Sequence, residues 1–245
     1  GRPGWHIECS VMATTILGDT IDIHGGGADL EFPHHTNEIA QSEAKTGKTF
    51  ANYWMHNGFV NVDNEKMSKS LGNFVTVHDM LKNVDGQVLR FFLATQQYRK
   101  PVNFTEKAVH DASVNLKYLK NTFTLPLTEE ADAAELAKFK ADFEAAMDDD
   151  FNTANGITVI FDMAKWINSG NYNQAVKDTF AKMLAVFGIV FEEEVLDADI
   201  EALIEKRQAA RANKDFATAD AIRDQLAAQG IKLLDTKDGV RWTRD

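Results

Sequence analysis

The chain has 245 residues, is 44% hydrophobic and 26% charged, and carries a formal net charge of -11 at pH 7. These values are typical of a globular protein with room for two or three domains, and they exclude a non-specific nucleic-acid coat while allowing a local RNA-binding face. A single cysteine excludes an internal disulfide framework, and no apolar run is long enough to span a bilayer, so we expect a soluble, cytoplasmic protein without a membrane partner.

The first 75 residues are rich in glycine, histidine and turn residues. Residues 20–24 alternate polar and apolar and lead into Gly25–Gly27, which predicts a strand followed by backbone that turns tightly or approaches a ligand. Pro33 can occupy the first turn of a helix that stops at Gly47. Strand, glycine turn and helix predict an α/β nucleotide-binding sheet, with residues 24–29 facing a site at the carboxyl ends of its strands.

Three potential metal ligands lie in this region. His34 and Glu38 are four residues apart on the predicted helix and share a face, and Cys9 lies in a preceding segment that we expect near the same crevice. Thiolate, imidazole and carboxylate are good Zn²⁺ ligands, and three protein ligands with an open position is the catalytic pattern. By spacing alone, a buried structural cysteine and a surface His-Glu pair remain an alternative.

The pentapeptide Lys66-Met67-Ser68-Lys69-Ser70 lies in a polar turn between two apolar runs. Two lysines with hydroxyls between them form a small cradle for phosphate, which can stabilise the charge that develops in phosphoryl or nucleotidyl transfer. A solvated loop is the alternative for an isolated match.

From Thr76 the apolar period changes to 3.6. Thr76 and Asp79 predict a capping box that opens a short helix, and residues 87–95 predict a strongly apolar helix. Arg99 and Lys100 after it either contact RNA or solvate a loop. Longer helices are predicted at 105–122, 130–147, 153–167 and 173–187, and together they form a bundle. We expect its aromatic residues to lie in the core, namely Phe143, Phe151, Phe161 and Trp166, and we expect Asp148–Asp150 to be a solvated helix end rather than a metal site.

Residues from about Phe191 predict a third unit. Two antiparallel helices, 198–212 and 216–229, precede a hairpin with an Asp-Gly turn, and Gly230 ends the second helix. Cations and an aromatic residue cluster here and suit single-stranded RNA, with a solvated helix face as the alternative: Lys206, Arg207, Arg211, Lys214, Arg223, Arg241, Trp242 and Arg244.

The pentapeptide with the following Leu71-Gly72-Asn73 resembles the KMSKS motif of class I aminoacyl-tRNA synthetases. The segments 4–10, 22–38 and 54–58, in this order and spacing, resemble the cysteinyl-tRNA synthetase family, and the likeness runs to Asp245. The resemblance implies the C-terminal part of a Rossmann-like catalytic domain, followed by a helical bundle and a small terminal α+β unit. The implied fold class is therefore α/β, then mostly α. The implied domains are 1–75, the remainder of the catalytic domain; 76–190, for tRNA-stem contact; and 191–245, for anticodon recognition.

The resemblance also implies roles for single residues. Zinc would be held by Cys9, His34 and Glu38, with one further cysteine ligand and the family's HIGH motif upstream. Because the chain begins at Gly1 without methionine and runs directly into motifs, we expect that an upstream part of the same protein is missing. Lys66 and Lys69 would stabilise the leaving pyrophosphate, and Ser68, Lys69 and Ser70 would bind ATP with its Mg²⁺. Trp5, His24 and Asp29 would contact the substrate cysteine; His24, His35 and His56 would line the pocket, although each histidine or Trp5 could equally serve packing, and Asp29 a turn.

The implied function is ATP-dependent activation of L-cysteine and its transfer to tRNA(Cys), with this chain alone expected to be inactive. One alternative is a mycothiol-type ligase, which shares the catalytic core and joins cysteine to an amino sugar; residues 198–245 count against it. The other is an RNA-binding fragment without catalysis.

Overall fold

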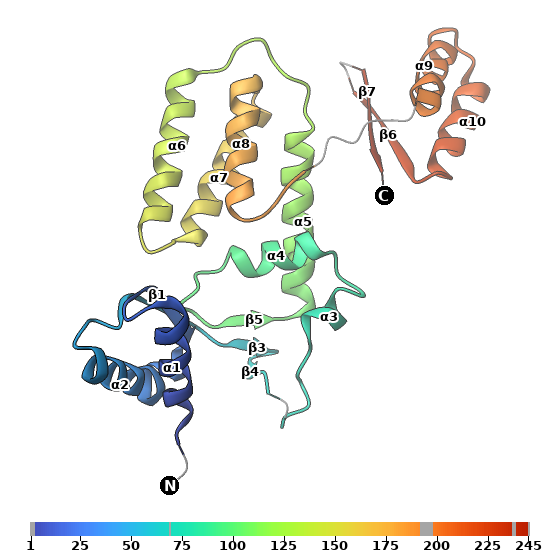
Figure 1. Ribbon diagram of the computed structural model, residues 1–245. Coiled ribbons are helices and arrows are strands. Elements are labelled where there is room, and N and C mark those ends of the chain that lie inside the picture. Colours follow the sequence, from blue (N-terminus) through green and yellow to red (C-terminus); the bar gives the residue numbers. More distant parts are fainter. Residues whose placement is uncertain (1–2, 69, 192–197, 237–238, 245) are drawn as a thin grey trace. The chain divides into compact units, whose positions relative to one another are not determined.

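In the computed structural model the chain divides into two compact units, Gly1–Phe191 and Glu192–Asp245. The structure describes residues 3–68, 70–191, 198–236 and 239–244. The first unit begins with α/β structure and continues as helices, and the second is a helix pair with a hairpin (Figure 1). Among the helices of these described residues, none combines the length and apolar character that a membrane span requires.

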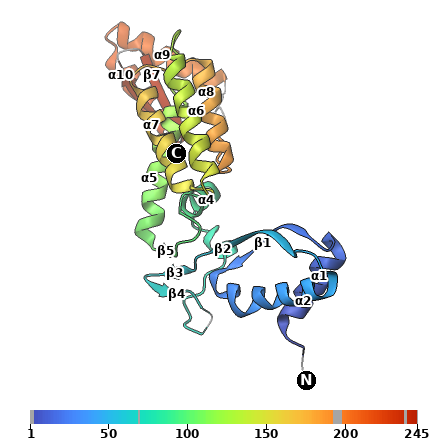
Figure 2. The same ribbon diagram turned by 90° about the vertical axis from the view of Figure 1, so that its left-hand side faces the viewer.

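The first unit opens with a β-α-β arrangement. Its elements are α1 (Trp5–Leu17), β1 (Ile21–Gly27), α2 (Thr36–Thr46) and β2 (Ala51–Asn57). Strands β1 and β2 are parallel, with Ile21 opposite Ala51 and Gly27 opposite Asn57. Helices α1 and α2 pack side by side (Figure 2). The predicted α/β fold of this region is therefore confirmed.

Two local details differ from the sequence prediction. Helix α2 begins at Thr36, not at Pro33: Pro33 lies in the turn η2 (Glu31–His35), where the backbone of Phe32 is extended. The helix ends as predicted at Gly47, whose φ of +67° is left-handed. Gly25 to Gly27 continue strand β1, and the chain turns only afterwards through the short helix η1 (Ala28–Leu30).

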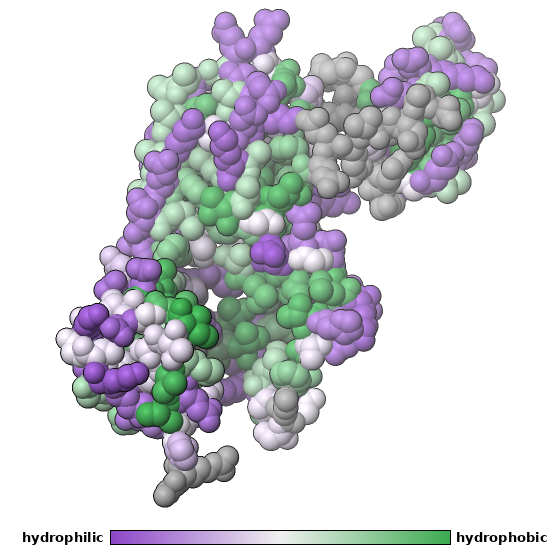
Figure 3. All heavy atoms as spheres, viewed as in Figure 1, coloured by the Kyte–Doolittle hydropathy of each residue, from purple (hydrophilic) through white to green (hydrophobic). Residues whose placement is uncertain are grey.

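Helix α1 was not predicted. It is apolar on all sides, so its sequence lacks the one-sided pattern that marks a surface helix. Several of its side chains are exposed nevertheless, and hydrophobic atoms are visible over this part of the molecule in Figure 3. The exposed apolar residues of α1 are Trp5, Ile7, Val11, Met12, Ile16 and Leu17.

A small mixed sheet links this region to the helices. It consists of β3 (Val60–Val62), β4 (Glu65–Lys66) and β5 (Val102–Phe104), with β3 in the middle. Between β4 and β5 lie α3 (Val77–Met80) and α4 (Gly86–Ala94). Thr76 caps α3 as predicted, since its hydroxyl oxygen accepts from the Asp79 backbone N–H at 3.0 Å.

The predicted helices of the bundle are present, and their ends differ from the prediction by at most three residues. They are α5 (Glu106–Phe123), α6 (Ala133–Asp148), α7 (Thr153–Asn168) and α8 (Gln174–Val186). Phe143 is buried, and Phe161 and Trp166 pack partly buried against the same core. The prediction for Phe151 was wrong: it is 52% exposed. Its φ of +51° follows a φ of +53° at Asp150, and this left-handed corner directs the ring away from the core.

The second unit has its own small core. Helices α9 (Ala198–Ala212) and α10 (Phe216–Ala227) pack together, and β6 (Ile231–Thr236) pairs antiparallel with β7 (Gly239–Arg244). Gly230, with φ of +76°, follows α10. The core consists of Ile200, Ile204, Ile222, Leu226 and Ile231. Of the predicted Asp-Gly turn, Asp238 lies outside the described residues, and Gly239 begins β7 opposite Thr236.

Candidate functional site

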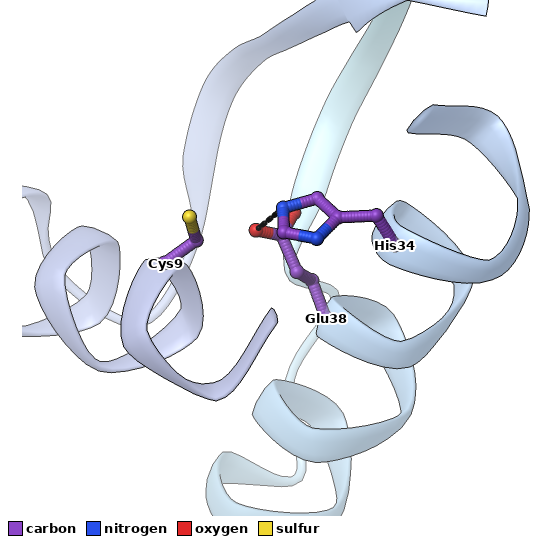
Figure 4. Close-up of side chains that lie close together, drawn as sticks. All are labelled: Cys9, His34 and Glu38. Carbon is purple, nitrogen blue, oxygen red and sulfur yellow. Dashed lines mark ion pairs between the residues drawn. The ribbon is translucent and has the colours of Figure 1, made fainter. Parts of the chain in front are cut away.

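Cys9, His34 and Glu38 come together between two packed helices. Cys9 projects from α1, His34 from the turn before α2, and Glu38 from the first turn of α2 (Figure 4). One donor atom from each side chain lies within 4.8 Å of the other two. The helices are joined beside the cluster by a hydrogen bond of 3.2 Å from Ser10 Oγ to Gln41 Oε1. The structure therefore places the three predicted ligands at one point.

The carboxylate of Glu38 is the centre of this cluster. Its side chain is 0% exposed, with Oε1 3.2 Å from His34 Nε2 and Oε2 2.7 Å from His24 Nε2. Despite these distances, neither oxygen has a hydrogen bond of good geometry. The two imidazoles are therefore close to the carboxylate but are not oriented to donate hydrogen bonds to its oxygens. A buried carboxylate without aligned donors costs free energy, which a bound cation would offset.

The donor set fits a soft divalent metal such as zinc. Sulfur, imidazole nitrogen and a carboxylate oxygen are the three ligand types that zinc takes in proteins. Burial raises the pKa of the Cys9 thiol, and the nearby Glu38 charge raises it further. A metal ion reverses that effect, because coordination deprotonates a thiol outright.

Three histidines extend the cluster toward the sheet. His35 Nδ1 lies 2.7 Å from His56 Nε2, and His24, His35 and Glu38 form a second group of donor atoms within 4.8 Å of one another. Burial, followed by the neighbouring His24, lowers the pKa of His35. The register that sets Gly26 opposite His56 brings these rings together.

Gly26 makes room for one of these rings, a role that the sequence prediction missed. A Cβ at Gly26 would lie 2.9 Å from His35 Cε1 and 3.0 Å from Leu30 Cδ1. The three-glycine run was the available signal, since it predicted a close approach to the backbone. Part of what approaches is a side chain of the same protein.

The two other predicted substrate contacts lie differently. The Trp5 ring is 63% exposed and its centroid is 4.5 Å from that of His34, so it covers one side of the cluster. Asp29 is exposed in η1, where its carboxylate lies beside the backbone of Gly27. Within the described residues, neither potential metal-binding group includes Asp29.

The KMSKS-like loop is held by a residue that we had not singled out for this role. Asn73 Oδ1 accepts from the Ser68 backbone N–H at 2.9 Å, and Asn73 Nδ2 donates to the Lys66 carbonyl at 3.3 Å. The hydroxyls of Ser68 and Ser70 lie 3.2 Å apart. Lys66 Nζ lies 3.9 Å from the centroid of the Phe59 ring. Lys69 lies outside the described residues.

Several basic residues of the second unit serve its own fold. Arg207 is buried, and its Nη1 and Nη2 donate to the two Asp235 oxygens at 2.8 and 2.9 Å. Arg211 Nη1 lies 2.5 Å from Asp235 Oδ1. Trp242 packs partly buried against the small core. Arg207 and Trp242 therefore do not form an exposed RNA platform, whereas Lys206, Lys214 and Arg223 are exposed; the side chains of Arg241 and Arg244 lie outside the described residues.

Family models match most of the chain in three consecutive parts. Residues 1–114 match the class I (C) tRNA synthetase catalytic domain. Residues 142–192 match the DALR domain, and residues 193–242 match the cysteinyl-tRNA ligase anticodon binding domain. The catalytic-domain match extends to residue 114, past the boundary expected at residue 75.

Curated relatives match over the whole chain. The cysteine–tRNA ligases of Streptococcus thermophilus strain CNRZ 1066 and Streptococcus agalactiae serotype V are 86% and 85% identical over all 245 residues. In both cases the chain spans 55% of the length of the relative. Among solved structures, the LeuRS of Agrobacterium radiobacter K84, in a ternary complex with tRNA and LeuAMS, aligns with a TM-score of 0.53 and 15% identity. That alignment covers 69% of this chain and 28% of the LeuRS, and it reflects a shared fold.

Proposed function

The chain belongs to the cysteinyl-tRNA synthetase family, and from that premise we propose that the whole protein activates L-cysteine with ATP and transfers it to tRNA(Cys) in the cytoplasm. The proposal covers the whole protein because the chain spans 55% of the length of its relatives. The observation that carries it is the Cys9, His34 and Glu38 cluster, built around a buried carboxylate without aligned donors.

Cys9, His34 and Glu38 would hold a zinc ion at this point. Zinc would supply a soft Lewis-acidic centre that binds the substrate thiolate and discriminates against the hydroxyl of serine. A hydrophobic pocket alone separates such similar side chains by only a few kcal/mol, about 1–3. The side chains around the ligands orient them: His24 contacts the second oxygen of Glu38 at 2.7 Å.

Trp5 would close the site on one side. Its ring lies against that of the proposed ligand His34, which restricts the imidazole and shields the cluster from water. His35 and His56, 2.7 Å apart, would line the pocket beside the cluster. We keep Asp29 as the candidate partner of the substrate amino group.

The KMSKS-like loop would act on ATP. Lys66 and Lys69 would neutralise the charge that develops on pyrophosphate as it leaves, and Ser68 and Ser70 would donate to phosphate oxygens beside Mg²⁺. The two serine hydroxyls lie 3.2 Å apart, and because only one of them donates in this contact, the other keeps its hydrogen for a phosphate oxygen.

Residues 76–190 would contact the tRNA stem, and residues 191–245 would recognise the anticodon. The match of residues 193–242 to an anticodon binding domain supports the role proposed for residues 191–245 and counts against the mycothiol-type ligase. An RNA-binding fragment without catalysis describes the isolated chain, because the proposed catalytic site uses parts of the relatives that this chain does not cover.

The exposed apolar side chains of α1 would pack on that further part of the protein. A helix that is hydrophobic on all sides belongs in a core, and exposure of 51% at Val11, 54% at Met12 and 78% at Ile16 leaves this one uncovered.

Zinc content tests the metal site directly. The chain, purified and equilibrated with zinc, is compared with its Cys9→Ser and His34→Ala variants by elemental analysis. We expect one equivalent in the parent chain and much less in both variants. His110→Ala, which removes an exposed histidine on α5, is the control and should retain the parent's content. Zinc that is unchanged in Cys9→Ser and His34→Ala would contradict this ligand set.

Adenylate formation tests the reaction. The chain alone should form little cysteinyl adenylate, and mixing it with the remaining part of a relative should restore activity. A mixture that binds zinc and tRNA(Cys) but forms no adenylate would favour the RNA-binding alternative.

A further inference from the structure

A cavity of about 470 Å³ lies in the first unit, lined by segments that are distant in sequence. It is formed by α4, the segment before β5, the corner between α6 and α7, and the end of α8. Its volume falls within the range of about 300–1,000 Å³ found for small-ligand sites. Its lining includes Arg90, Gln96, Tyr98, Phe151 and Phe187.

The walls of this cavity are tied together by side-chain contacts. The Asp150 carboxylate accepts from Tyr98 Oη at 2.7 Å and from Arg99 Nε at 2.6 Å. Thr153 Oγ1 donates to the Gln96 carbonyl at 2.8 Å. These bonds join the segment before β5 to the corner between α6 and α7, so the cavity is formed in advance and a ligand loses little free energy in ordering it.

Phe151 is held at the cavity in a costly conformation. Left-handed backbone at two consecutive residues other than glycine, Asp150 and Phe151, costs about 1–3 kcal/mol each. In return the ring lines the cavity while remaining 52% exposed. Because an exposed phenyl ring does not stabilise the core, the strain points to a binding role.

Two polar side chains at the cavity are available to a ligand. In the described part of the chain, neither the Arg90 guanidinium nor the Gln96 side-chain amide has an ion pair or a hydrogen bond. Arg90 lies against Gly188, where a Cβ would be 2.9 Å from Arg90 Cδ. The carboxylate of Asp150 is already paired with Arg99 and Tyr98. Asp148 and Asp149 are exposed nearby in sequence and disfavour a phosphate backbone that follows this surface.

We propose that this cavity receives one unpaired base of the tRNA, stacked on Phe151, with its edge bonded by Gln96 or Arg90. Aromatic surface with amide and guanidinium donors is the chemistry that recognises unstacked bases in RNA. The inference rests on the proposed function, since it requires that this chain binds tRNA. It adds a base contact within the first unit, separate from the anticodon unit.

Binding of a tRNA(Cys) transcript to the 245-residue chain tests the inference. Phe151→Leu retains an apolar side chain and removes the aromatic face, and we expect the Kd by fluorescence anisotropy to rise about tenfold, as for the loss of one stacked base. The increase should be the same at low and high salt, because no phosphate contact is removed. Arg90→Gln should weaken binding as well.

Two control variants and a cross-link complete the test. Tyr53→Leu and Lys48→Gln change exposed side chains within residues 1–75, outside the part proposed to contact the tRNA stem, and should leave the Kd unchanged. Replacement of Phe151 by p-benzoylphenylalanine should yield a cross-link to a nucleotide that is unpaired in the tRNA.

The outcomes separate the two proposals. If the parent chain does not bind the transcript, its role in tRNA binding fails and the inference fails with it. If the parent binds and the Phe151 and Arg90 variants behave like the controls, or the cross-link maps to a paired stem, the inference alone is overturned.

Discussion

Replacement of the buried Glu38 by Gln should change stability in opposite directions without and with zinc. The carboxylate is 0% exposed, with two imidazoles nearby and no hydrogen bond of good geometry. An ion taken out of water costs several kcal/mol, which its neighbours offset only in part, so we expect Glu38→Gln to raise the free energy of unfolding of the metal-free chain by about 1–3 kcal/mol.

Zinc should reverse this order. A ligand at 100 times its Kd stabilises the folded state by about 2.7 kcal/mol. The parent chain should gain that amount, and Glu38→Gln should gain little, because a neutral amide is a much weaker zinc ligand than a carboxylate.

Urea unfolding at pH 7.5, in EDTA and in excess zinc, measures both effects. Glu43→Gln is the matched control: it makes the same change on the same helix at a half-buried residue that accepts from the Phe50 backbone N–H at 3.0 Å. It should leave the zinc-induced gain intact. If Glu38→Gln is destabilised in EDTA and retains the full zinc-induced gain, Glu38 is a structural residue and the assignment is wrong.

Three further predictions concern other parts of the chain. Gly26→Ala should displace His35 and lower zinc affinity about 10–100-fold, as loss of an outer-shell partner does, whereas Gly86→Ala, whose Cβ would meet only Leu81 Cδ2 at 3.5 Å, should leave that affinity unchanged in a competition titration. Asn73→Ala should release the KMSKS-like loop and raise the KM for ATP in the reconstituted enzyme, while zinc binding at Cys9, His34 and Glu38 stays constant. An unchanged KM for ATP would refute the role of Asn73 in holding the loop. The Arg207 and Arg211 guanidiniums hold the pKa of Asp235 below its usual range, so this contribution to stability is complete above the unfolded pKa of about 3.9 and is lost as the pH falls through the folded value. Asp235→Asn should therefore reduce the acid-range loss of hydrogen-exchange protection in α9 and α10, and the exposed Asp224→Asn should not.

The sequence alone determined much of the fold, because its signals are local. Thr76 and Gly47 marked helix ends through their own backbone chemistry, and the 3.6 period located α5 to α8 to within three residues. It also selected Cys9, His34 and Glu38, two of them by helical spacing and the third by its place in a segment expected near the same crevice.

Tertiary structure decided which side chains meet and which face solvent. His24, His35 and His56 converge because β1 and β2 pair in parallel in one register, and that register is a contact between distant segments. By residue type, Arg207 was expected to be a surface cation. In the structure its guanidinium is buried and donates to the carboxylate of Asp235, 28 residues later. Phe151 looked like core, but the left-handed corner at Asp150 directs its ring outward. Periodicity reports the conformation of a segment and not its partners, so these placements depend on the folded chain.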